Sequence, residues 1–217
     1  MNKKNNLILL LVSSIICLLP IVLSLAVYKD LPEQVAMQWN LEGDPNWYAH
    51  KSIAAFGMPL FFLLIHIVVI IALNKDPKRA NQSKAIRLFA IWISPILSLT
   101  IVPILLFSAL GFDIPILIII MVLVGIFFIF LGNYMNKNKQ NYTAGIRIPW
   151  TLNDPDNWNK THRMAGFLWV IGGIIFIIVP FLPLDSSFQL IIIFSIIALL
   201  TLMPIFYSYS LYKKGNK

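Results

Sequence analysis

The side chains best suited to bind a partner are concentrated in one polar stretch, residues 132–166, between long apolar segments. This stretch combines basic residues such as Arg147 with Trp150, Trp158 and many turn-forming residues. It is too polar to lie in hydrocarbon and too rich in tryptophan to be a plain linker. Its composition fits a loop at the lipid headgroups, with basic groups at phosphates and indoles in the aromatic belt. It equally fits a surface that docks a partner or closes one end of a helix bundle.

The sequence contains no arrangement typical of a catalytic or metal site. It lacks the H-E-x-x-H and G-x-S-x-G motifs and a phosphate-binding glycine loop. The three histidines, His50, His66 and His162, are expected at different depths, so a shared metal site is not expected. Cys17 is the only cysteine and cannot form an internal disulfide. We therefore predict a protein that is not an enzyme and needs no cofactor and no metal.

The composition places most of the chain in lipid rather than in water. Of its 217 residues, 59% are hydrophobic and 12% are charged, whereas soluble domains carry roughly 25% charged residues. The apolar residues form long uninterrupted runs, and about 20 such residues span a bilayer as a helix. The net charge of +8 lies in short loops beside these runs, so direct binding of nucleic acid is not expected.

Six apolar runs are long enough to cross a membrane. We predict an all-α fold, a six-helix transmembrane bundle of three successive hairpins, with both termini cytoplasmic. One integral membrane domain would cover residues 1–217, with an outer loop at 29–52 and a cytoplasmic motif at 132–166. The predicted spans are residues 7–28, 53–73, 88–110, 114–131, 167–182 and 188–209.

The charges of the connecting segments set the predicted orientation. Every segment expected inside carries a net positive charge, and every loop expected outside carries a net negative charge. Positively charged loops stay in the cytoplasm, so a flipped chain would place every basic cluster on the wrong side. We therefore predict a multi-pass protein of the bacterial cell membrane.

Within the cytoplasmic motif, the sequence predicts a helix start and an extended segment. Asp154 suits an N-cap and Pro155 the first helical position, so a helix is expected to run from there into the fifth span. Trp158 and His162 are four residues apart and would share one face of this helix. Residues 145–150 are expected to be extended, because the residue before a proline avoids the helical region.

The outer loop is acidic and contains turn-forming residues at 43–46. Its aromatic residues Trp39, Trp47 and Tyr48 suit the headgroup level, where they would anchor two helix ends. The same residues could form a rigid aromatic platform for a cationic or amphipathic peptide. Composition leaves both interpretations open.

Small and polar residues inside the spans indicate helix packing rather than chemistry. Gly125 and Gly132 are seven residues apart, as are Gly166 and Gly173, so each pair lies on one helix face. His66 is the only ionisable side chain well inside a predicted span. A neighbouring helix could satisfy a neutral imidazole, and no carboxylate accompanies it, so we interpret His66 as structural.

Two motifs in the polar segments resemble those of one known family. The outer motif comprises Leu31, Pro32, Val35, Trp39, Asn40, Gly43, Asp44, Pro45 and Lys51. The inner motif joins the sequence GNYM at 132–135 to Asn141, to GIRIPWTL at 145–152 and then to Trp158, Thr161, His162 and Arg163. Together they resemble the SdpI-type immunity family of bacterial membrane proteins, and the resemblance covers nearly the whole chain.

The resemblance implies six spans and protection of a producer cell from a secreted, membrane-active peptide toxin of the sporulation-delay kind. In the best-known members of this family, the toxin-occupied protein also holds a small DNA-binding repressor at the membrane. The implied partners are therefore membrane lipid, a secreted peptide toxin and a small repressor. Many members carry a histidine where this chain has Gln38, so no role of that histidine is carried over.

The resemblance assigns different expected roles to the two polar segments. The outer loop would engage the toxin, and its candidate residues are Leu31, Pro32, Trp39, Asn40, Gly43, Asp44 and Trp47. The inner motif would stabilise the cytoplasmic side or dock the repressor, and its candidate residues are Asn133, Asn141, Gly145, Arg147, Pro149, Trp150, Thr151, Trp158, His162 and Arg163.

Two other classes of function make different demands on the sequence. A small membrane transporter or channel would line a path with polar helix faces, and His66 would then matter. A membrane enzyme would need acid, base or metal-binding groups clustered at one depth, and the sequence shows no such cluster.

Overall fold

The computed structural model describes residues 3–40 and 42–215, and most of its regular structure is helical. Asn2 and Lys217 of the predicted cytoplasmic ends, and residue 41 of the outer loop, lie outside the described residues. Within the described residues, six helical segments are long and apolar enough to cross a membrane, and each overlaps one of the predicted spans. These segments are Leu7–Val27, Ile53–Lys75, Lys84–Ala109, Ile116–Met135, Pro155–Phe181 and Ser186–Gly215.

Several helices continue beyond the predicted spans. Helix α7 (Pro155–Ile178) begins at Pro155 rather than at residue 167, and α8 (Ser186–Gly215) continues past residue 209. Helix α4 (Lys84–Ala109) begins before residue 88. The predicted limits mark where apolar side chains end, whereas the backbone ladder continues through polar residues that also favour helices, such as lysine and arginine.

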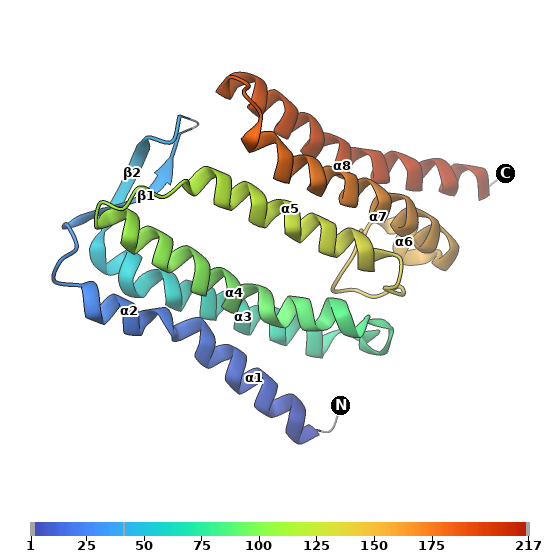
Figure 1. Ribbon diagram of the computed structural model, residues 1–217. Coiled ribbons are helices and arrows are strands. Elements are labelled where there is room, and N and C mark those ends of the chain that lie inside the picture. The colour runs from blue at the N-terminus through green and yellow to red at the C-terminus, as the bar shows by residue number, and fades with distance from the viewer. Residues whose placement is uncertain (1–2, 41, 216–217) are drawn as a thin grey trace. The chain divides into compact units, whose positions relative to one another are not determined.

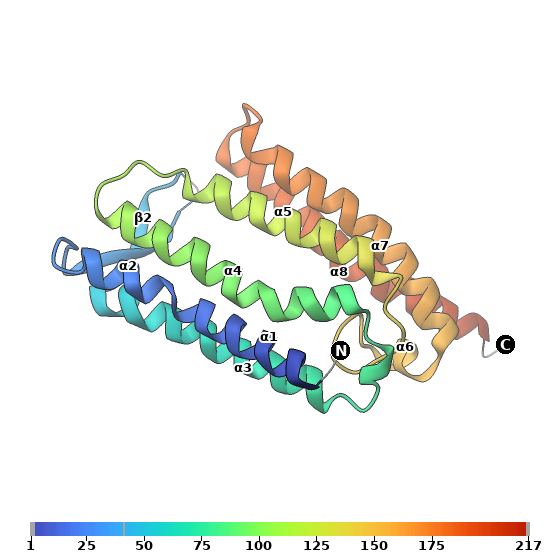
Figure 2. The same cartoon turned by 60° about the horizontal axis from the view of Figure 1, so that its bottom comes forward.

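The chain divides into two compact units, which are described separately. Unit 1 comprises residues 1–74 and 88–116. Its helices run alongside one another in Figures 1 and 2. Its elements are α1 (Lys3–Leu18), α2 (Pro20–Val27), β1 (Gln34–Trp39), β2 (Pro45–His50), the π-helical turn η1 (Ile53–Gly57), α3 (Met58–Lys75) and most of α4.

Unit 1 is held together by an apolar core and by buried hydroxyl groups. The core consists of Leu31, Ala55, Phe62, Val102 and Leu106. The Ser24 hydroxyl donates to the carbonyl of Ala55 at 2.7 Å, and the Ser98 hydroxyl donates to the carbonyl of Cys17 at 2.7 Å. Lipid offers no competing hydrogen-bond partner, so these bonds fix α2 against η1 and α4 against α1.

His66 lies fully buried in unit 1 and contacts α1. The Ser13 hydroxyl donates to the carbonyl of Leu10 at 3.1 Å, so it accepts from Nε2 of His66 at 2.9 Å. The imidazole thus has a partner on another helix, as expected for a neutral histidine. Its Nδ1 has no hydrogen bond within the described chain.

The outer loop contains a β-hairpin, so the prediction of an all-α fold is wrong at this point. Strands β1 and β2 pair antiparallel from Gln34 opposite His50 to Trp39 opposite Pro45, with an irregular register around Gln38. β-Branched and aromatic residues in this loop favour strands, a signal that its polar turn chemistry obscured. Gly43 adopts the left-handed conformation, with a φ of 89°, that closes the turn.

Unit 2 comprises residues 75–87 and 117–217. Helices α7 and α8 pack along each other (Figures 1 and 2). Phe176 of α7 and Ile196 and Leu200 of α8 form a buried apolar cluster. Its elements are the short 3₁₀ turn η2 (Arg79–Asn81), α5 (Ile116–Met135), α6 (Pro149–Asn153), α7, the 3₁₀ turn η3 (Val179–Phe181) and α8.

Glycines bring α5 and α7 into close contact, as their spacing predicts. A Cβ atom on Gly132 would lie 2.6 Å from the carbonyl oxygen of Gly166, and one on Gly125 would lie 2.6 Å from that of Gly173. No ordinary Cβ contact is this short, so this approach requires glycine. The pairing also shows that α5 and α7 run in opposite directions.

Candidate functional site

The outer hairpin presents aromatic side chains from its distal half. Trp47 is 54% exposed and Tyr48 is 50% exposed, and as successive strand residues they point to opposite faces. The turn beyond them is ordered, because Asn40 Oδ1 accepts from the Asp44 N–H at 2.8 Å. The hairpin therefore offers rigid, exposed aromatic surface on both faces.

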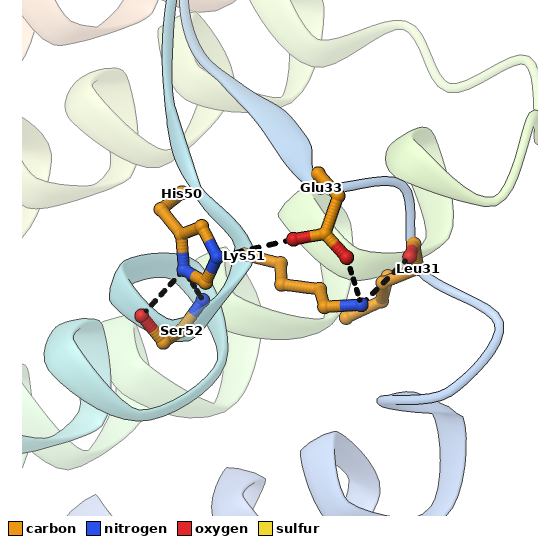
Figure 3. Close-up of polar contacts among 5 residues, drawn as sticks. All are labelled: Leu31, Glu33, His50, Lys51 and Ser52. Carbon is orange, nitrogen blue, oxygen red and sulfur yellow. Dashed lines mark hydrogen bonds and ion pairs between the residues drawn. The ribbon is translucent and has the colours of Figure 1, made fainter.

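The base of the hairpin is fixed by polar contacts, which Figure 3 shows. Glu33 accepts from Lys51 Nζ at 3.0 Å and contacts His50 Nε2 at 3.1 Å, while His50 Nδ1 contacts Ser52 Oγ at 2.8 Å. Lys51 Nζ also donates to the carbonyl of Leu31 at 3.4 Å. Its hydrogen bond and positive charge lower the pKa of the Glu33 carboxyl.

The seven predicted residues of the outer loop lie at three locations: the distal half of the hairpin, its base and the core of unit 1. Trp39, Asn40, Gly43, Asp44 and Trp47 lie together at the distal half of the hairpin, whereas Leu31 is buried in the core of unit 1 and Pro32 is exposed near the base. The base contacts through Glu33 and His50 were not predicted. The sequence shows only an acidic residue just before β1 and a basic residue at the end of β2, and the pairing of Gln34 with His50 is what brings them together.

In unit 2, the polar stretch after α5 folds into a turn organised by Asn141. The buried Asn141 Oδ1 accepts from the N–H groups of Thr143 and Ala144 at 3.0 and 2.8 Å, and its Nδ2 donates to the carbonyl of Lys139 at 2.8 Å. Asn138 is also buried and donates to the carbonyl of Ala144 at 2.8 Å. The asparagine amides thus make the hydrogen bonds to backbone groups that a helix or sheet would otherwise provide.

Trp158 and His162 form a buried stack against this turn. Their ring centroids are 3.9 Å apart, and Trp158 Nε1 donates to the carbonyl of Asn138 at 2.7 Å. The shared helix face was predicted correctly, but placing Trp158 in the aromatic belt is wrong, because its side chain is fully buried. Gly145, with a φ of 124°, packs on the stack, and its Cβ would lie 2.5 Å from His162 Nε2.

The contacts of His162 fix its protonation state. Nε2 accepts from the N–H of Ile146 at 2.9 Å, so Nδ1 carries the proton and donates to the carbonyl of Trp158 at 2.8 Å. A second proton on Nε2 would face the donor of Ile146. The imidazole is therefore neutral and serves as a connector between α7 and the turn.

The segment after Gly145 is extended only as far as Ile148. Ile148 has φ −109° and ψ 160°, as expected before a proline, but Pro149 and Trp150 begin α6, so the predicted extended segment is wrong there. Buried Thr151 explains the change, because its hydroxyl donates to the carbonyl of Ile146 at 2.6 Å and accepts from the Ile148 N–H at 3.2 Å. The N-cap at Asp154 is confirmed, with its side chain accepting from the N–H of Asp156.

Asp76 joins the segment 75–87 to this turn, and the sequence analysis missed it. Its Oδ2 accepts from the N–H of Tyr142 at 3.0 Å, from the hydroxyl of Thr143 at 2.6 Å and from Gln82 Nε2 at 3.2 Å, and its Oδ1 accepts from the N–H of Lys78 at 2.7 Å. Burial raises the pKa of this carboxyl, but the hydrogen bonds outweigh burial and lower it. In the sequence, Asp76 is distinguished only as the one acidic residue of a basic loop.

Further contacts make the two segments one polar cap, which we define as residues 75–87 and 137–153 of unit 2. Lys78 Nζ donates to Gln140 Oε1 at 2.6 Å, and Asn81 Nδ2 donates to the carbonyl of Gln140 at 2.8 Å. The N–H of Ser83 donates to Asn138 Oδ1 at 3.1 Å. The cap is thus a folded structure with most of its polar groups paired internally.

The remaining predicted residues of the inner motif lie at the surface of unit 2. Arg147 is exposed and donates through Nη1 to the carbonyl of Tyr142 at 2.5 Å, while Arg163 and Asn133 are exposed on α7 and α5. Trp150 packs against Tyr209 and Tyr212 of α8, with ring centroids 5.0 and 6.1 Å apart. Within the described part of the chain, no three acidic, histidine or cysteine side chains are grouped to hold a metal.

Comparisons with known proteins match both polar segments. The model of the SdpI/YfhL protein family matches residues 137–208, and that of a domain of unknown function, DUF1648, matches residues 15–63. Immunity protein SdpI of Bacillus subtilis (strain 168) is 29% identical over 221 aligned residues, which cover 99% of this chain and 98% of that protein. The chain thus resembles the SdpI/YfhL family over residues 137–208 and Immunity protein SdpI along nearly its whole length. No solved structure matches it.

Each of the two family models covers one of the polar segments of the chain. The match over residues 15–63 includes the whole outer hairpin and the base contacts of Glu33 and Lys51. The match over 137–208 begins in the polar cap and continues through α7 into α8. The resemblance first indicated by the two motifs is thereby confirmed over both segments.

Proposed function

We propose that this protein is an immunity protein, which protects its cell from a secreted, membrane-active peptide toxin of the sporulation-delay kind. The observation that carries the proposal is the similarity along 99% of the chain to a relative named Immunity protein SdpI. The multi-pass architecture suits a protein that meets such a toxin in the membrane.

The outer hairpin is the proposed contact for the toxin. Trp47 and Tyr48 supply exposed aromatic area, and Glu42 and Asp44 at the turn are exposed acids. Aromatic faces and carboxylates together favour a cationic, amphipathic peptide. Contacts at the hairpin base hold this surface in place, so little ordering would be needed on binding.

The polar cap is the proposed cytoplasmic face, where a small DNA-binding repressor would dock. Arg147 supports this role, because its guanidinium makes one hydrogen bond, through Nη1, in the described structure and keeps further donors exposed. A guanidinium of this kind pairs well with a carboxylate of a partner.

Survival of a toxin-sensitive cell that lacks its own immunity protein tests the proposed function. Expression of this chain is expected to restore growth in purified sporulation-delay-type toxin, at membrane levels checked by immunoblot. Absence of rescue at normal membrane levels would refute the proposal. Transport of an ion or peptide by the purified chain in liposomes, without rescue, would instead identify a transporter.

A repressor-controlled reporter tests the cytoplasmic role separately. The Arg147→Ala protein is expected to protect the cell normally but to leave the repressor free, so that the reporter stays off. Lys213→Ala, which removes an exposed cation in the last turn of α8 and outside the polar cap, is the matched control and should leave the reporter on. A reporter that responds equally to Arg147→Ala and wild type would exclude Arg147 as a docking residue.

A further inference from the structure

A cavity of about 370 Å³ opens at the C-terminal end of α8. All of its lining residues belong to unit 2: Pro149, Trp150, Asn153, Asp154, Leu211, Tyr212 and Gly215. One wall comes from α6 and the start of α7, and the other comes from the last turn of α8. No part of the proposed toxin contact lies in this cavity.

The walls of this cavity suit a cation. The Trp150 ring lies 6.1 Å from the Tyr212 ring, centroid to centroid, and aromatic faces attract ammonium groups. Asp154 adds a negative charge. Its Oδ1 caps α7 by accepting from the N–H of Asp156 at 2.8 Å, and its Oδ2 makes no hydrogen bond in the described structure. The neighbouring Lys160 does not fill this place, because it pairs with Asp156 at 2.8 Å.

The position of the cavity along α8 points to a lipid headgroup. Helix α8 has 30 residues and is therefore about 45 Å long, whereas the hydrocarbon core is about 30 Å thick. The last turn carries Lys213 and Lys214, so this is an end that extends beyond the hydrocarbon. Trp150, Tyr209 and Tyr212 gather at this end, as aromatic residues do at headgroup level. Lys213 and Lys214 follow Tyr212 and suit a phosphate.

We propose that this cavity binds the headgroup of a zwitterionic phosphoethanolamine lipid. The ammonium group lies against Asp154 and the ring of Trp150, and the phosphate lies on the side of Lys213 and Lys214. A phosphoglycerol headgroup brings no cation to Asp154, and its negative charge is repelled by that carboxylate. The site therefore selects ethanolamine over glycerol headgroups and does not depend on the proposed immunity function.

Native mass spectrometry of the purified full chain tests this selection. The detergent-solubilised protein is mixed with phosphatidylethanolamine and phosphatidylglycerol of identical acyl chains at equal concentrations. The wild type is expected to retain phosphatidylethanolamine about fivefold more than phosphatidylglycerol, as a partly exposed cation–aromatic and carboxylate site allows. Trp150→Leu should reduce this preference.

Two capping carboxylates provide a matched pair of variants. Asp154→Asn removes the charge but keeps an equally good N-cap, so α7 still begins normally. Asp185→Asn removes an exposed charge before α8, from a side chain that accepts from the N–H of Ser187 at 3.0 Å and does not line the cavity. The preference should disappear in Asp154→Asn and persist in Asp185→Asn.

Three results would overturn the proposal. They are equal retention of both lipids by the wild type, an unchanged preference in Asp154→Asn, and an equal loss of preference in both variants. The last result would indicate a general effect of surface charge. If Trp150→Leu does not assemble, the two asparagine variants still decide the question, because neither disturbs packing.

Discussion

Replacing Asp76 by asparagine should loosen the polar cap without altering the membrane helices. The change preserves the shape of the side chain but leaves one oxygen where the carboxylate has two. If that oxygen keeps the donors of Tyr142, Thr143 and Gln82, the new NH₂ group faces the N–H of Lys78. At least one hydrogen bond becomes a contact between two donors, and the others lose their charge.

The structure sets the size of this effect. Hydrogen bonds to a charged group contribute about 1.5–3 kcal/mol each and neutral ones about 1 kcal/mol, so one lost bond and three weakened bonds remove at least about 3 kcal/mol. Burying a neutral amide costs less than burying a carboxylate, which returns part of this loss and leaves a net destabilisation of about 2–4 kcal/mol. Asp76 is 5% exposed, so solvent screens little of this loss. The cap should therefore open about 30- to 1,000-fold more often, at about 1.4 kcal/mol for each factor of ten.

Trypsin cleavage measures the opening of the cap, because the cap contains Lys78, Arg79 and Lys139. The rate of cleavage at these sites in detergent-solubilised protein should rise in proportion to the open population. Asp113→Asn, an isosteric change at an exposed connection between α4 and α5, is the control and should cleave like the wild type. Cleavage of Asp76→Asn within threefold of that control would refute the reasoning.

Three further predictions concern the other contacts. Gly132→Ala should destabilise the α5–α7 contact by about 1–3 kcal/mol in thermal unfolding. Gly57→Ala is the control and should be tolerated, because the added Cβ would lie 3.4 Å from its nearest neighbouring atom. Equal melting temperatures of the two variants would contradict this prediction. His162→Phe keeps the aromatic stack but leaves the partly buried N–H of Ile146 unpaired, at a cost of about 1–3 kcal/mol, and unchanged thermal stability would count against it. The lowered pKa of Glu33 means that the hairpin base is stabilised above the unfolded-state pKa and loses this contribution as pH falls through the folded-state pKa. The protection factors for hydrogen exchange at the hairpin base, which correct for the slower intrinsic exchange in acid, should then fall on acidification in the wild type but not in Glu33→Gln.

The sequence predicted the features that depend on continuous composition or local spacing. Six helices of the described chain that are long and apolar enough to cross a membrane follow from apolar length. The N-cap at Asp154 follows from Asp-Pro chemistry, and the glycine contacts follow from two seven-residue spacings. Each of these signals lies within one stretch of chain. These features could be predicted without knowing which distant segments contact each other.

The features that were missed depend on which segments meet. Asp76 acquires its role from Tyr142 and Thr143, more than 60 residues away in the chain. Trp158 suited a membrane interface by type, but the carbonyl of Asn138 gives its indole N–H a buried partner. The hairpin was missed because its strands are short and interrupted by polar residues. The alternation of apolar and polar residues that marks a strand was therefore weak, and the turn-forming residues at 43–46 were the clearer pattern.

Binding of purified toxin to the purified protein in nanodiscs tests the central claim most directly. The wild type should bind, and Trp47→Ala should weaken binding at least tenfold, as the loss of a central aromatic contact does. Phe112→Ala, which removes a 60% exposed aromatic side chain outside the hairpin, should bind like the wild type. Absence of binding by the wild type, or equal affinity of Trp47→Ala, would contradict recognition of the toxin by the outer hairpin.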